Sequence, residues 1–386
     1  MRNISIGIDL GSSTVRVVVG EFEKGEKEPK IIGAGEAPAL GMRRGYVIDE
    51  DTAVESVRKA VAEAERSSEI RIRRAYLAVN NITLHGDIAL GSTIISKADS
   101  EVTSLDIRNA FENAEDNLNL TNKRVLQVSP ITYKLDGKEV FGRPEGMHGN
   151  KLEVKALFAT TSTQHFENQL AVLAKAGIET IGVVPSIVSG SHLSLSKKQK
   201  MAGCLLVDIG ADTVSIAVFE NEALIYLHTL PLGSNDITND IALGLKITLE
   251  EAEQVKLGKL NDKFPKKKID EIIDARLSDI FELIENHLKK IKRNELLPAG
   301  IIFIGKGAHI IGLTDAAKTF LKLPAQLGDT EMFGSSKTKL RDIAWYSTLG
   351  LLYTQKSEHS IASNSLESAW QSFKNLIKTN IKQLLP

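Results

Sequence analysis

Two stretches of this chain repeat one pattern of apolar and polar positions. Each begins with an apolar run, continues through Asp-X-Gly and a small polar turn, and ends in an alternating run of β-branched residues. The first copy spans residues 8–19 and the second spans residues 207–218. Such a pattern predicts a β-hairpin with a glycine-containing turn. Because one copy opens each half of the chain, the repeat favours two similar domains over two unrelated turns.

The first hairpin is followed by a helical pattern, in which apolar residues recur at helical spacing from Glu50 to Arg66. A strand is predicted at 75–79. Residues 81–158 then break the alternation of the flanking halves. We interpret them as an inserted subdomain, with strands near 82–90, 125–135 and 152–160, a helix near 104–118, and a Gly/Pro loop at 142–149.

The second half has its own series of α and β elements. Two short helices are predicted after a strand at 224–229, and the second begins at the capping box Thr248-Leu249-Glu250-Glu251. A long amphipathic helix follows at 269–291. A buried strand then leads into Gly305–Ala308, where glycine suggests that the backbone lies close to a ligand.

Composition narrows the classes of function. The 386 residues carry a formal net charge of −1 and include one cysteine. This charge balance gives no basic field for nucleic acid, and a single cysteine excludes a disulfide framework and a cysteine-based zinc site. No apolar run approaches the ~20 residues of a membrane-spanning helix, and a strand from about Ile4 leaves no room for a signal peptide. We expect a cytoplasmic protein.

The C-terminal segment combines a polar stretch with an amphipathic pattern. Residues 355–366 predict a flexible linker. In residues 367–386, apolar side chains share one face and lysines recur every four residues on another, which favours a helix in an anionic membrane surface over a helix docked on the domain. The predicted membrane-binding residues are Trp370, Phe373, Lys374, Ile377, Lys378, Ile381, Lys382, Leu384 and Leu385.

The hairpin turns have the chemistry of a phosphate site. Gly11 and Gly210 permit close backbone approach, so the N–H groups of each turn can face phosphate oxygens. Asp9 and Asp208 can hold a hydrated divalent cation. Two such hairpins facing one cleft would grip a phosphate-bound nucleotide between two domains.

In this order, the two hairpins and the Gly305–Ala308 turn resemble the phosphate-1, phosphate-2 and adenosine motifs of the actin-like ATPase superfamily. Within it, the chain is most similar to the FtsA family of bacterial cell-division proteins. Residues 230–242 resemble that family's stretch after phosphate-2, and residues 249–256 resemble its helix that contacts ribose and adenine. Residues 133–137 and 146–154 resemble its inserted subdomain, called 1C.

The resemblance implies a duplicated, ribonuclease-H-like α/β fold of actin type, with two domains, a nucleotide cleft, an inserted subdomain 1C and a C-terminal amphipathic helix. Its parts would be subdomain 1A at 1–80 and 159–200, 1C at 81–158, 2A at 201–235 and 296–337, 2B at 236–295, and a return helix to 1A at 338–354.

The resemblance also implies ATP and Mg²⁺ as ligands. Asp9 and Asp208 would organise Mg²⁺ and water. The residues that the resemblance places at the nucleotide are Gly11, Ser12, Ser13, Thr14, Gly210, Ala211, Asp212, Thr213, Gly233, Asn239, Glu253, Lys256, Gly305, Lys306, Gly307 and Ala308.

Three positions depart from the family pattern. Asp212 and Lys306 stand where glycine is common, and an acidic Asp212 near phosphates is unfavourable unless it faces the metal or solvent. Val184 stands where actin-fold hydrolases commonly place Gln or Glu to orient the attacking water. Since a valine cannot hydrogen-bond water, we expect nucleotide binding with at most slow ATP hydrolysis.

The implied function is a peripheral protein on the cytoplasmic face of the inner membrane at the division site. It would polymerise with itself, bind anionic lipid through the C-terminal helix and tether FtsZ filaments, whose C-terminal tail would bind subdomain 2B. Later division proteins would bind subdomain 1C. Other interpretations are a PilM-like pilus-assembly scaffold, an actin-fold small-molecule kinase and an Hsp70-like chaperone. The amphipathic tail and the segment Ile237-Thr238-Asn239-Asp240 favour the FtsA-like interpretation.

Overall fold

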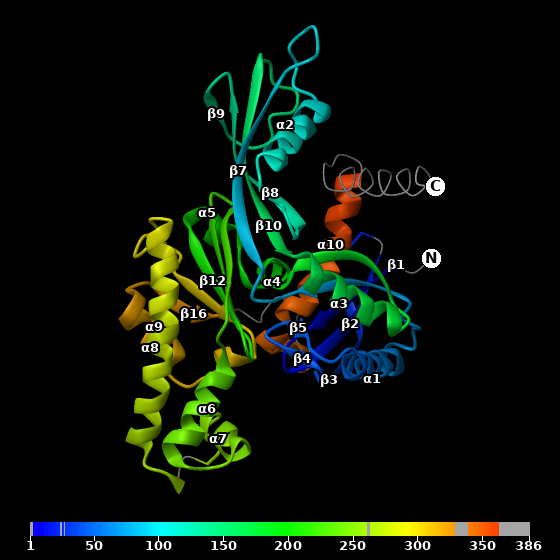
Figure 1. Cartoon of the computed structure of the whole chain (residues 1–386). Helices are drawn as coiled ribbons and strands as arrows, with labels where there is room; N and C mark the ends of the chain where they lie inside the picture. The colour runs from blue at the N-terminus through cyan, green and yellow to red at the C-terminus, as the bar shows by residue number, and fades with distance from the viewer. Residues whose placement is uncertain (1–2, 24, 27, 261–262, 329–338, 363–386) are drawn as a thin grey trace.

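The computed structural model of this chain describes residues 3–362 except 24, 27, 261–262 and 329–338. Two large β-sheets form its frame, and each contains one of the two predicted hairpins (Figure 1). We call β1–β2 hairpin 1 and β12–β13 hairpin 2. In hairpin 1 Leu10 lies opposite Val15, and in hairpin 2 Ile209 lies opposite Val214. The two predicted hairpins are therefore confirmed.

The first sheet has the strand order β11-β6-β1-β2-β3. Antiparallel pairing joins β1, β2 and β3, whereas β6 and β11 run parallel to β1. Helix α1 packs across this sheet, where glycines of β3 let the helix backbone approach closely. The elements of this part are β1 (Asn3–Leu10), β2 (Thr14–Phe22), β3 (Lys30–Pro38), β4 (Met42–Arg43), β5 (Tyr46–Val47), α1 (Glu50–Ser68), β6 (Arg74–Val79), α3 (Thr163–Lys175), β11 (Glu179–Pro185), α4 (Ser186–Ser194) and α5 (Lys197–Ala202).

The second sheet has nine strands in the order β16-β15-β12-β13-β14-β7-β10-β8-β9. Its first five strands belong to the second half of the chain. Strand β12 is buried along its whole length, as expected for a central strand covered on both faces. These strands are β12 (Cys204–Ile209), β13 (Val214–Glu220), β14 (Ala223–Leu230), β15 (Ile301–Ile304) and β16 (Ala325–Leu327).

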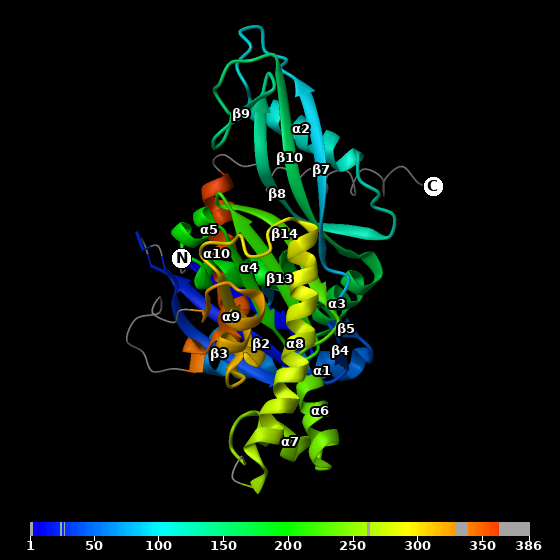
Figure 2. The ribbon, with the colours of Figure 1, turned by 90° about the vertical axis from the view of Figure 1, so that its left-hand side faces the viewer.

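The other four strands of this sheet belong to the insertion, which projects from one end of the molecule (Figures 1 and 2). It has a hydrophobic core of its own, between α2 and the strands. The predicted helix and three long strands are confirmed with small shifts of their ends. The elements are β7 (His85–Ile94), α2 (Ser104–Asp116), β8 (Lys123–Leu135), β9 (Lys138–Val140) and β10 (Lys151–Ser162).

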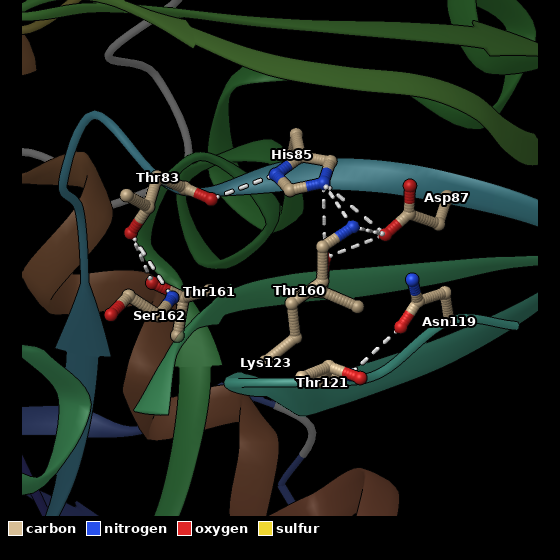
Figure 3. A network of polar contacts seen from close by, with 9 residues as sticks. All are labelled: Thr83, His85, Asp87, Asn119, Thr121, Lys123, Thr160, Thr161 and Ser162. Carbon is tan, nitrogen blue, oxygen red and sulfur yellow. Dashed lines mark hydrogen bonds and ion pairs between the residues drawn. The ribbon is translucent and has the colours of Figure 1, made fainter. Parts of the chain in front are cut away.

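The base of the insertion contains a polar network (Figure 3). His85 Nδ1 lies 2.8 Å from the carbonyl oxygen of Thr83 and must donate to it, since a carbonyl only accepts. Lys123 Nζ and Thr160 Oγ1 both donate to Asp87 Oδ2, each at 2.9 Å. One backbone bridge, between His85 and His228, joins β7 to β14 and so connects the insertion to the sheet of the second half.

The opposite end of the molecule is helical (Figures 1 and 2). Helix α6 begins at Ser234, where the Asp236 carboxylate accepts a hydrogen bond from the Gly233 N–H at 2.8 Å and caps the first turn. The capping box predicted at Thr248 is confirmed. The helices and short 3₁₀ turns of the second half are α6 (Ser234–Leu245), α7 (Leu249–Lys256), α8 (Lys266–Lys290), η2 (Lys306–His309), α9 (Leu313–Leu321), η4 (Lys339–Arg341) and η5 (Ile343–Trp345).

The C-terminal helix α10 (Tyr346–Ala362) returns to the first half and packs on α4. Ser189 Oγ donates to the Ser347 carbonyl at 2.6 Å where the two helices cross. The linker was predicted to begin at residue 355, and this start is wrong because helix α10 continues to Ala362. Gln, Lys and Glu have good helix propensity, and this polar stretch contains Gln355, Lys356 and Glu358. The polarity of the stretch therefore could not distinguish a helix from a linker. The predicted membrane helix at 367–386 lies outside the described residues.

Candidate functional site

The turns of the two hairpins open onto one cleft between the halves. The turn of hairpin 2 is closed by a hydrogen bond from the Gly210 N–H to the Thr213 carbonyl, at 2.9 Å. The cleft has about 570 Å³ of empty space, a volume that includes open solvent at its entrance. Its lining residues are Asp9, Gly11, Ser12, Ser13, Thr14, Arg16, Asn80, Ser186, Asp208, Gly210, Ala211, Thr213, Gly305, Lys306, Ala344 and Ser347.

The Gly305 turn reaches this cleft because residue 305 is glycine. Gly305 has a φ of 86°, a conformation that side chains other than glycine rarely adopt. A Cβ at this position would also collide with Asp208 Oδ1. The turn at Gly305 and Lys306 can therefore lie directly beside the carboxylate at the end of β12.

Two buried carboxylates stand in the cleft. Burial raises the pKa of Asp9 to about 7; the nearby positive charge of Arg16 opposes this and the negative charge of Asp208 adds to it. Burial also raises the pKa of Asp208, although Ser347 Oγ donates a hydrogen bond to Asp208 Oδ2 at 3.1 Å. Both shifts show that the site disfavours its own negative charge, which is the condition that a bound cation relieves.

The donors in this cleft suit Mg²⁺ held partly through water. Within the described part of the chain, no three or more His, Cys, Asp or Glu side chains group together as a metal site. Mg²⁺ usually keeps several waters and takes one or two carboxylates together with phosphate oxygens. Asp9 and Asp208 fit that pattern, and the metal remains a prediction.

Five residues of the cleft were not among the predicted site residues: Arg16, Asn80, Ser186, Ala344 and Ser347. Asn80 follows β6, and it donates to Thr213 Oγ1 at 3.2 Å and accepts from Ser215 Oγ at 2.9 Å. Ser186, at the first position of α4, has a buried hydroxyl with no hydrogen-bond partner. A buried polar atom of this kind is accounted for by a ligand or a water. Only Arg16 had a sequence signal, as the cross-strand partner of Asp9.

Seven predicted nucleotide residues do not line this cleft: Asp212, Gly233, Asn239, Glu253, Lys256, Gly307 and Ala308. Gly233 and Gly307 have packing roles, since a Cβ on either would collide with hairpin 2 at Ala211 or Ile209. Asn239 lies exposed on α6. These glycines bring α6 and η2 against the hairpin rather than facing the space between the halves.

Lys256 and Glu253 form an ion pair on α7. Lys256 Nζ donates to Glu253 Oε2 at 2.6 Å, to Thr238 Oγ1 at 2.8 Å and to the Ser234 carbonyl at 3.1 Å. Only 4% of the Lys256 side chain is exposed. An ammonium group has three donors, so Lys256 has none left for a ribose in this arrangement.

Val184 does not stand at the cleft either. It lies in β11 opposite Ala78 and belongs to the hydrophobic core. The interpretation that Val184 stands in place of a water-orienting Gln or Glu stays a prediction, since Val184 is absent from the residues that line the cleft. The predicted slow hydrolysis remains a prediction, and Asn80 and Ser186 supply the polar groups on this wall.

No helix among the residues whose placement is described is long and apolar enough to cross a bilayer. The nine predicted membrane-binding residues, from Trp370 to Leu385, lie outside the described residues.

Comparison with known proteins identifies the family. The model described as "Cell division protein FtsA" matches residues 205–350, and the model described as "SHS2 domain inserted in FTSA" matches residues 82–160. Together the two ranges cover more than half of the chain. The chain is 29% identical to the cell division protein FtsA of Bacillus subtilis, over 91% of this chain and 83% of that protein. It is 26% identical to FtsA of Escherichia coli K12, over 93% and 91% of the two chains.

Solved structures agree on the fold. A chain of the PilM–PilN type IV pilus biogenesis complex superposes with a TM-score of 0.65 at 18% identity, over 91% of this chain and 98% of that chain. MreB5 of Spiroplasma citri bound to ADP gives 0.52 at 14% identity, over 94% and 98%. These likenesses show an actin-like fold, and the family models specify the type. This chain belongs to the FtsA family of cell-division proteins.

Proposed function

We propose that this protein binds ATP with Mg²⁺ in the cleft between its halves and acts in division as a nucleotide-dependent filament former. The observation that carries the proposal is the convergence of hairpin 1, hairpin 2 and the Gly305 turn on one space. The turns of Ser12 and Gly210 would hold the phosphates, and Asp9 and Asp208 would hold the metal. Mg²⁺ would neutralise phosphate charge beside these two carboxylates.

Slow hydrolysis is part of the proposal. Among the described residues that line the cleft there is no Glu or Gln. The side-chain amide of Asn80 is already hydrogen-bonded to Thr213 and Ser215. Positioning is most of what a protein contributes to phosphoryl transfer. We expect turnover well below the ~1–10³ s⁻¹ typical of enzymes. Steady-state ATPase assays on the purified protein measure it, and fast multiple turnover would favour a kinase-like enzyme instead.

The membrane part of the proposal rests on sequence alone. Residues 367–386 would lie in the anionic inner face of the cell membrane at the division site, and polymerisation would strengthen this attachment through avidity. FtsZ tails would bind near α6–α8, in subdomain 2B, and later division proteins would bind the insertion, subdomain 1C. The polymer would in this way tether FtsZ filaments to the membrane.

Co-sedimentation with anionic vesicles tests the tether. Full-length protein should pellet with the vesicles, should bring FtsZ down with it in Mg²⁺–ATP, and should bind less at high salt. Deletion of residues 367–386 should leave both proteins in the supernatant while ATP binding is unchanged. Equal pelleting of the two forms, or pelleting of neither, would remove the membrane role.

A further inference from the structure

A short hairpin of the first half, formed by β4 and β5, reaches the turns of hairpin 1 and hairpin 2. The Gly45 N–H donates to Ser12 Oγ in the turn of hairpin 1, at 3.0 Å. The adjacent Arg44 N–H donates to Asp212 Oδ2 in the turn of hairpin 2, at 3.1 Å. Two successive backbone amides therefore connect the turn of hairpin 1 with the turn of hairpin 2, one from each half of the chain.

The Asp212 carboxylate is held from both sides. Its Oδ1 accepts from Asn235 Nδ2 at 2.8 Å, at the start of α6. With its two oxygens occupied in this way, the carboxylate does not line the cleft. An acidic residue in a phosphate-binding turn is explained if its role is to accept the amide of the other half.

The tip of the β4–β5 hairpin is firmly seated on the first half. Gln169 Nε2 of α3 donates to the Gly45 carbonyl at 3.0 Å, and the Tyr46 and His165 rings stack with centroids 3.6 Å apart. Gly45 has a φ of 76°, and a Cβ there would collide with the backbone of Asn80. Because the tip is fixed to its own half, its hydrogen bond to Asp212 resists separation of the halves.

We propose that Arg44–Gly45 and Asp212 form a latch that holds the cleft closed over its ligand and slows nucleotide release. The contact itself needs no nucleotide, whereas its role in release rests on the proposed function. Ser12 is positioned by the same element: its oxygen accepts the Gly45 N–H, so its own hydrogen is free to point elsewhere. Asp212 is a positioning residue in this account and does not touch the nucleotide.

Residue-resolved hydrogen exchange on the nucleotide-free protein tests the contact. Asp212→Ala should speed exchange of the Arg44 amide roughly tenfold, as loss of a hydrogen bond to a charged acceptor implies, while the Gly45 amide changes less. Asp212→Asn, which keeps the shape, should act in the same direction, because a neutral amide oxygen is a weaker acceptor than a carboxylate and must serve both the Arg44 N–H and the Asn235 amide. Asp136→Ala is the matched control: Asp136 also accepts backbone amides, those of Asn150 and Lys151, but within the insertion.

Release of a fluorescent ATP analogue with Mg²⁺ tests the role. Both Asp212 variants should release the analogue about five- to tenfold faster than the wild type. Two controls should release it as the wild type does: Asp136→Ala and Arg44→Asn. The Arg44→Asn variant keeps the backbone amide, and asparagine tolerates the φ of 51° at this position. Unchanged release from an Asp212 variant, or fast exchange of the Arg44 amide in the wild type, overturns the latch. If the wild type binds no Mg²⁺–ATP, the proposed function fails, and the role of the latch in nucleotide release fails with it. In that case the hydrogen-exchange data still show whether the Arg44–Asp212 contact forms.

Discussion

Hairpins 1 and 2 share one sequence pattern, but their polar side chains make different contacts. All four turn residues of hairpin 1, from Gly11 to Thr14, line the cleft, whereas Asp212 of hairpin 2 turns away to bind the β4–β5 hairpin. Asp9 lies opposite a charged residue, Arg16, in its own hairpin. Asp208 lies opposite Ser215 and accepts a hydrogen bond from Ser347 of the distant helix α10.

This comparison separates what a repeat encodes from what its surroundings decide. The order of apolar run, Asp-X-Gly and β-branched run dictates the backbone of each hairpin. The role of each polar side chain depends on the element that faces it, and those elements are not repeated. The following variants test how far the two hairpins are equivalent.

The largest effect is expected from a bulky side chain in the turns. Gly210→Val should lower ATP affinity at least ~10-fold, the equivalent of ~1.4 kcal/mol, because the side chain occupies the place of phosphate. Gly11→Val should also lower stability more than Gly210→Val does. A Cβ on Gly11 would lie 2.7 Å from the Thr14 carbonyl oxygen, whereas on Gly210 the nearest atom would be 3.0 Å away.

Titration calorimetry and thermal denaturation measure these two effects. A folded Gly210→Val protein that binds ATP as the wild type does would contradict the assignment of the cleft.

The second prediction concerns the two buried carboxylates. Because the pKa of Asp9 is raised from 3.8 to about 7, the native state holds this proton at pH values where the unfolded state has lost it. The contribution of Asp9 to the free energy of unfolding therefore falls as pH rises from about 4 to about 7. Asp9→Asn should abolish this fall and should be relatively more stable than the wild type above pH 7.

Denaturant unfolding at a series of pH values, without nucleotide, checks this prediction. Asp208→Asn should show a change in the same direction, because burial raises the pKa of Asp208 as well. Identical pH profiles of Asp9→Asn and the wild type would show that Asp9 is ionised in the folded protein at the lower pH values.

A smaller effect is expected at Lys306, the one Lys or Arg of the second half among the described residues that line the cleft. Lys306→Ala should weaken ATP binding by a few-fold, in line with ~1 kcal/mol or less for a partly solvated charge, and the difference should shrink as salt rises. Binding measured at low and high ionic strength checks this. A loss of affinity that does not depend on salt would mean that Lys306 contacts phosphate directly, with water excluded from the contact.

The smallest effect is expected at Lys256. Since its donors are occupied by Glu253, Thr238 and Ser234, Lys256→Met should change ATP affinity by less than about twofold while lowering thermal stability. Competition binding with ATP measures the first quantity and thermal denaturation the second. A tenfold loss of affinity in a stable protein would restore the predicted ribose contact.

Much of the fold and part of the site follow from local sequence pattern. Both hairpins, the insertion and the Gly305 turn were predicted because each is encoded by contiguous residues with a definite period. Asn80, Ser186 and Ser347 were missed because each arrives at the cleft from the end of an element without a motif of its own. Sequence alone cannot decide the role of Lys256, because a buried ion pair and a ligand contact use the same residues at the same spacing on a helix.

The single backbone bridge between His85 and His228 has a mechanical consequence. Along the chain, the insertion hangs from the first half, between β6 and α3, yet its strands extend the sheet of the second half. Rotation of one half against the other must therefore strain this junction. Strand β10 alone, with 12 residues, extends about 40 Å. If the halves rotate against each other, the far tip of the insertion would therefore move farther than the junction, because displacement grows with distance from the axis of rotation.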